Sequence, residues 1–107
     1  MTDADKMVIL KNRDNAEESD EALSAALLTA RYAIMSRAYP FTHDFTDVPF
    51  PARYDMLQVE IANVLIKKAG ADGETVHVEN GIERHYEMAD IPPSMLMPVV
   101  PSVGVIK

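Results

Sequence analysis

The order of apolar and polar residues predicts three helices before residue 70. Across Glu21–Tyr39, apolar side chains recur at spacings of four, three and four residues, which places them on one side of a helix. They are Leu23, Leu27, Ala30 and Ile34. A second long helix is predicted over Ala52–Ala69. Its apolar side carries Tyr54, Leu57, Ile61, Val64 and Leu65 and is continued by Lys68. A shorter helix is predicted over Thr2–Lys11, where an oxygen of Thr2 or Asp3 can cap the first turn.

Residues that start and stop helices stand at the ends of the long segments. Ser19 or Asp20 can cap the first long helix, and Pro40 ends it because proline cannot continue the backbone hydrogen bonding. Gly70 is placed to cap the second long helix at its C-terminal end. We therefore expect residues 2–70 to form a helical core.

The segment between the two long helices, Phe41–Ala52, is a proline-bounded loop with three phenylalanines. A loop seldom carries so much aromatic surface unless something covers it, so it either packs back over the helices or meets a partner. We expect Phe41 and Phe45 to pack back. The sequence leaves the environment of Phe50 open.

Residues 74–88 are typical of a β-hairpin. Asn80-Gly81 suits a two-residue type I′ turn, and the runs on either side, Thr75–Glu79 and Ile82–Glu87, have strand-like composition. Pairing across this turn puts apolar and charged side chains on both faces of the ribbon. Neither face could cover a core by itself, so the hairpin is expected to need a neighbour in this chain or in another molecule.

The C-terminal arm, residues 92–107, is apolar and interrupted by prolines, which excludes a central strand or a long helix. One helical turn can form over Ser94–Met97 before Pro98 stops it. Exposed aliphatic side chains at a chain end promote aggregation, so we expect those of the arm to lie against something. They are Val99, Val100, Val103, Val105 and Ile106.

The predicted fold is thus mainly α: a small bundle of two long helices and a short N-terminal helix, with one β-hairpin and an extended C-terminal arm. A chain of 107 residues with 48% hydrophobic and 25% charged residues is typical of a single folded domain, here residues 1–107. No cysteine is present, so disulfides and thiolate metal sites are excluded. With no basic leader and no long apolar run, the protein is expected to be made in the cytosol.

Charge and candidate chemistry disfavour nucleic-acid binding and catalysis. A net charge of −7 repels a phosphate backbone, although like charge would let DNA slide past without adsorbing. His77 and His85 fall on opposite faces of the predicted hairpin and cannot chelate one ion together, and His43 stands apart. No phosphate-binding loop or hydrolase motif is present. We expect no metal, no cofactor and no enzymatic activity.

Taken together, three stretches resemble the head–tail connector, or adaptor, proteins of long-tailed bacteriophages. They read RYAIMSRAYPF, YDMLQVEIANVLIKKAGADGE and HVENGIERHYEMADIPPSMLMPVVPSVGVI. In that family a similar helix is followed by a glycine-acidic turn, a Glu-Asn-Gly hairpin, an Ile-Pro link and a hydrophobic terminus. The resemblance covers most of the chain and is closest over Val59–Ile106.

This resemblance implies a structural virion protein, located at the head–tail interface and assembled in the host cytoplasm. The subunits would form a homo-oligomeric ring that docks on the portal, extends the DNA channel and receives the next connector or tail component. Subunit contacts are then expected at Val76, Val78, Ile82, Arg84 and Tyr86. Portal contacts are expected at Val99, Val100, Val103, Val105 and Ile106.

A second class of function stays open on the residues alone. A small acidic interaction module, such as an antitoxin or an anti-repressor, could use the same hairpin and arm on a single partner protein. It would be a monomer or a dimer at all concentrations, whereas a connector forms closed rings.

Overall fold

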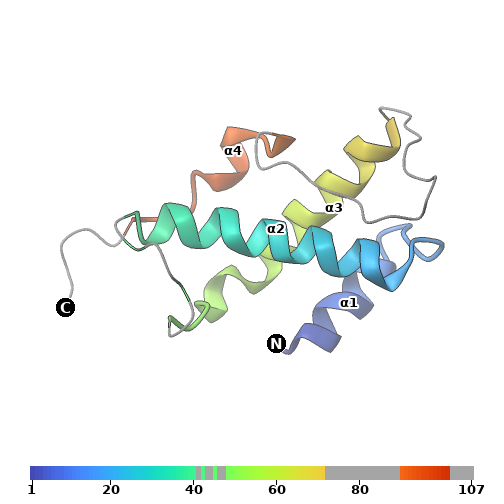
Figure 1. The fold of residues 1–107 in the computed structure, drawn as a ribbon, viewed down its shortest axis with the longest axis horizontal. Helices are drawn as coiled ribbons and strands as arrows, with labels where there is room; N and C mark the ends of the chain where they lie inside the picture. The colour runs from blue at the N-terminus through green and yellow to red at the C-terminus, as the bar shows by residue number, and fades with distance from the viewer. Residues whose placement is uncertain (41, 43–44, 46–47, 72–89, 102–107) are drawn as a thin grey trace.

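The computed structural model describes residues 1–40, 42, 45, 48–71 and 90–101, and this part of the chain is mainly helical (Figure 1). Its elements are α1 (Asp3–Lys11), α2 (Asp20–Ala38), a 3₁₀ turn η1 (Ala52–Tyr54), α3 (Asp55–Ala71) and α4 (Pro93–Leu96). The short N-terminal helix and the two long helices of the prediction are confirmed. The predicted β-hairpin, residues 74–88, lies outside the described residues.

Side-chain caps set the starts of the first two helices. Thr2 is the N-cap of α1: its hydroxyl accepts from the Asp5 backbone N–H at 3.1 Å, and the Asp5 carboxylate accepts from the Thr2 N–H at 3.1 Å. Ser19 caps α2 by accepting from the Ala22 N–H at 3.1 Å. The C-terminal end of α3 differs from the prediction. The helix continues through Gly70 to Ala71, so Gly70 is a helical residue and not the cap.

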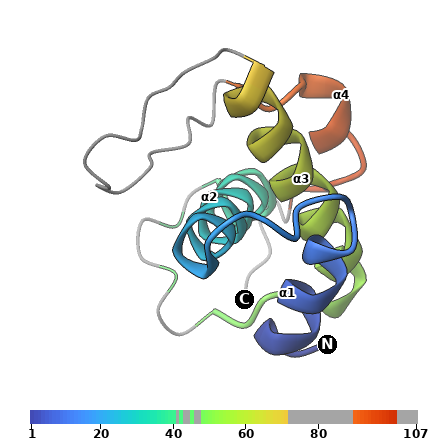
Figure 2. The same cartoon turned by 90° about the vertical axis from the view of Figure 1, so that its right-hand side faces the viewer.

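The core lies where α2 crosses α3, with α1 packed against both helices (Figures 1 and 2). The predicted stripe of α2 is buried throughout: Leu23, Leu27, Ala30 and Ile34 are all at most 7% exposed. On α3 the core residues are Tyr54 of the preceding turn and Val59, Ile61, Ala62, Leu65 and Ile66. Fully buried alanines, Ala26, Ala30 and Ala62, let the two backbones approach closely.

The buried side of α3 is broader than predicted. Of the predicted residues, Tyr54, Ile61 and Leu65 are buried, Leu57 and Val64 are half-buried, and Lys68 is exposed. Val59, Ala62 and Ile66 are buried as well. The reason is that α3 contacts α2 and α1 at once, so a single apolar stripe does not describe it.

The phenylalanine-rich loop packs back on the bundle where it is described. Phe45 is half-buried and meets the ring of Tyr32 edge-on, with 5.7 Å between ring centroids, which confirms the prediction for this residue. Phe50 packs against the core, and the centroid of its ring lies 4.7 Å from the Lys6 ammonium and 5.1 Å from the Arg31 guanidinium. Phe41 lies outside the described residues. No helix in the described ranges has the length and apolar character that a membrane crossing requires.

Candidate functional site

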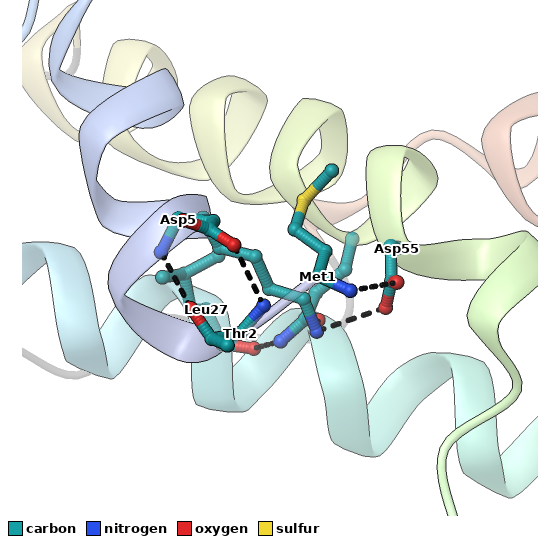
Figure 3. A network of polar contacts seen from close by, with 7 residues as sticks. Met1, Thr2, Asp5, Leu27 and Asp55 are labelled. Atoms are coloured by element: carbon teal, nitrogen blue, oxygen red, sulfur yellow. Dashed lines mark hydrogen bonds and ion pairs between the residues drawn. The ribbon is translucent and has the colours of Figure 1, made fainter.

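A buried polar cluster joins the three main helices beneath the N-terminus (Figure 3). The Lys6 side chain is buried, and its ammonium lies 3.1 Å from the Asp55 Oδ1 and 2.5 Å from the Gln58 Oε1. Gln58 in turn donates from Nε2 to the Leu27 carbonyl oxygen at 2.8 Å. The α-amino group of Met1 lies 3.5 Å from the other oxygen of Asp55. The hydrogen-bonding groups of this cluster are directed at one another, which indicates a structural role.

A second polar cluster fixes the turn between α1 and α2 on α3. The buried side chain of Asn15 donates to the Leu10 carbonyl and to the Asn63 Oδ1, both at 2.9 Å. Its own Oδ1 accepts from the Lys67 ammonium at 3.0 Å. Asp14 beside it has φ of 68°, a left-handed conformation that aspartate tolerates better than most residues. This cluster also uses its polar groups internally.

The described residues hold no group of three histidine, aspartate or glutamate side chains arranged to bind a metal ion. His43, His77 and His85 lie outside the part of the chain that the structure describes. The backbone N–H and hydroxyl of Thr2 lower the pKa of the Asp5 carboxyl, and this shift reflects helix capping.

The described C-terminal segment is held on the bundle by a set of contacts that we name the clasp, formed by Arg37, Arg53, Tyr54, Val99 and Val100. Val99 is fully buried, and its carbonyl accepts from the Arg37 Nε at 3.0 Å. The next residue, Val100, donates its backbone N–H to the Tyr54 Oη at 3.1 Å. The Arg53 guanidinium lies 4.8 Å from the centroid of the Tyr54 ring. The clasp thus ties the segment to the end of α2 and to η1.

The clasp also alters the acidity of Tyr54. Burial raises the pKa of its hydroxyl, but the hydrogen bond from the Val100 N–H and the nearby Arg53 charge lower it, and the resulting pKa is below the ordinary value. A group with a lowered folded-state pKa adds stability as the pH rises through that pKa towards the unfolded value of 10.0. The contribution of Tyr54 to stability is therefore expected to grow on the alkaline side.

Replacing Tyr54 with phenylalanine tests the clasp. The change leaves the buried ring in place and removes the acceptor for Val100, so we expect a loss of about 1 kcal/mol in the free energy of unfolding. Amide hydrogen exchange at Val100 should become faster, and the alkaline gain in stability should disappear. Tyr32→Phe is the matched control, because the Tyr32 side chain is about half exposed and contacts Phe45 through its ring. Unchanged exchange at Val100 in Tyr54→Phe would contradict the clasp.

The residues expected to bind the portal differ in their exposure to solvent. Val99 is 0% exposed and belongs to the core, so in this structure it packs against its own chain. Val100, in contrast, is 64% exposed. Val103, Val105 and Ile106 lie outside the described residues, as do the expected subunit contacts Val76, Val78, Ile82, Arg84 and Tyr86.

Exposed apolar side chains gather on the outer side of the clasped segment. Met97 is 70% exposed, and Pro98 and Pro101 are exposed beside it. Together with Val100 these residues form what we call the arm surface. The sequence gives no sign that Arg37 and Tyr54 hold this segment, because their contacts with residues 99 and 100 span about half of the chain and leave no local pattern.

Comparison with family models, with curated proteins and with solved structures finds no match in any of the three. The functional argument therefore rests on the residues and on their arrangement.

Proposed function

We propose that this chain is a structural subunit of a phage head–tail connector, which assembles as a ring on the portal and extends the channel for DNA. The observation that supports this most is the clasp. It holds the start of the C-terminal arm at a fixed place on the helical body, with Val99 buried and Val100 outward. A docking arm gains affinity when its base is already ordered, because less conformational freedom is lost on binding.

We assign a separate role to each part of the subunit. The helical bundle is the rigid body, and the hairpin residues Val76, Val78, Ile82, Arg84 and Tyr86 are the proposed contacts between neighbouring subunits. Val103, Val105 and Ile106 are the proposed contacts with the portal. The net charge of −7 suits a conduit through which DNA passes without adsorbing.

Truncation after Pro101 tests the role of the arm. The shortened chain keeps Val99 in the core and keeps both clasp hydrogen bonds, so its free energy of unfolding should match that of the full chain within about 0.5 kcal/mol. Binding to the portal protein of the same virus, measured by surface plasmon resonance, should fall at least tenfold, roughly the effect of losing one buried aliphatic anchor.

The position of the cut matters for this experiment. Removal of Pro98–Lys107 would also take away buried Val99, and any loss of binding would then be confounded with a loss of stability. Full portal binding by residues 1–101 would contradict the proposed role of the arm.

A further inference from the structure

Two arginines of the clasp, Arg37 and Arg53, lie beside the arm surface. The Arg37 guanidinium reaches the Val99 carbonyl and the Arg53 guanidinium covers Tyr54, and both side chains are otherwise exposed. Within the described ranges neither of them has a carboxylate at ion-pair distance. The net charge of the protein is −7, but this end of the bundle combines exposed apolar residues with the positive charges of two arginines.

The opposite end of α2 is rich in carboxylates, of which Asp20 is paired with the Lys11 ammonium at 3.0 Å. Five carboxylates fall between residues 14 and 21: Asp14, Glu17, Glu18, Asp20 and Glu21. Glu17 and Glu21 are exposed, and Ala16, which precedes Glu17, is exposed as well. The two ends are about 27 Å apart, since a helix of 19 residues rises 1.5 Å per residue, and Figure 1 shows them at opposite ends of α2. They cannot neutralise each other within one molecule.

We infer that the arm surface of one subunit binds the acidic end of α2 in a second copy of this chain. Arg37 and Arg53 would face Glu17 and Glu21, while Met97 and Val100 would lie against Ala16 and the methylene groups of the two glutamates. The inference rests on the proposed function and specifies one contact of the proposed ring. It assigns Val100 to a neighbouring subunit and leaves the arm beyond Pro101 to the portal.

The contact joins two different surfaces, so a bound pair of subunits still offers one free surface of each kind. Such a heterologous contact repeats from copy to copy, and it closes into a ring when the rotation per subunit allows. Because the charges are exposed, the association should weaken as salt is added and the screening length becomes shorter.

Charge reversal with mixing tests this contact. Sedimentation velocity of the full chain should show association that strengthens with concentration up to about 1 mM and weakens on raising the salt from about 0.1 M to 1 M. Glu17→Lys with Glu21→Lys should weaken it about tenfold, since two exposed attractions become repulsions, and Arg53→Glu, which reverses one of them, should weaken it about threefold. An equimolar mixture of the two variants should associate again, because the unchanged arm surface of the Glu17→Lys, Glu21→Lys chain can bind the unchanged acidic end of the Arg53→Glu chain.

Two controls separate this contact from general effects of charge. Leu28→Lys adds a charge at an exposed site in the middle of α2, away from both ends of the helix, and should leave the association unchanged. Circular dichroism should show the same helical content for all variants. The inference would be overturned if the chain stays monomeric at about 1 mM, or if the charge-reversing substitutions leave its association unchanged.

The outcome for portal binding is read separately. If the chain docks on the portal but shows no charge-dependent self-association, the proposed function stands and the inferred contact between subunits is wrong. If the chain self-associates through these charges but does not bind the portal, the inferred contact stands and the proposed function is wrong.

Discussion

Replacing Asp55 with alanine is expected to lower the free energy of unfolding by about 3–5 kcal/mol, which is a large part of the stability of a domain this size. The Lys6 ammonium is buried with its side chain only 4% exposed, and Asp55 at 3.1 Å is its charged partner. Loss of the carboxylate leaves a buried positive charge whose remaining contacts are the neutral Gln58 amide and the Phe50 ring. Urea denaturation followed by circular dichroism measures the effect.

The double variant Lys6→Met with Asp55→Leu is the matched control. It removes both charges and fills the space with apolar atoms, so it should recover most of the stability that Asp55→Ala loses. A loss below about 1 kcal/mol in Asp55→Ala would show that the Lys6 ammonium reaches water, which is incompatible with its burial.

Replacing Leu23 with alanine is expected to destabilise the fold by about 2–5 kcal/mol. Leu23 is 0% exposed and lies on the side of α2 that faces the core, so its removal leaves a cavity as well as losing buried apolar surface. Thermal or urea unfolding of the purified chain gives the value.

Leu28→Ala provides the same chemical change on the same helix at a site that is 67% exposed. It should alter the stability by no more than about 0.5 kcal/mol. If the two variants are destabilised equally, the side of α2 that faces the core has been assigned incorrectly. The Leu28 side chain would then be covered in solution.

The helices could be predicted because their signals are local. The spacing of Leu23, Leu27, Ala30 and Ile34 fixes one side of α2, and the capping oxygens of Thr2 and Ser19 fix where two helices begin. The single helical turn before Pro98 was also predictable, since proline prevents it from continuing.

The clasp and the buried cluster could not be predicted, since both depend on residues far apart in sequence. From the sequence alone, Lys6 would be predicted to lie on the surface. Its burial depends on Asp55 and Gln58, which are about fifty positions later in the chain. Val99 is expected from the sequence to be covered, but only the contacts of Arg37 and Tyr54 with residues 99 and 100 show that its own helical bundle covers it. The breadth of the buried side of α3 likewise depends on α1, whose position no periodicity specifies.

Electron microscopy of the full chain mixed with the portal protein of the same virus tests the central claim most directly. The proposed function predicts closed rings of this chain seated on the portal, coaxial with its channel, and a particle mass that exceeds that of the portal by a whole number of subunits. Portal particles without added density, together with a chain that stays a monomer or a dimer at every concentration, would contradict the connector function and favour an interaction module with a single partner.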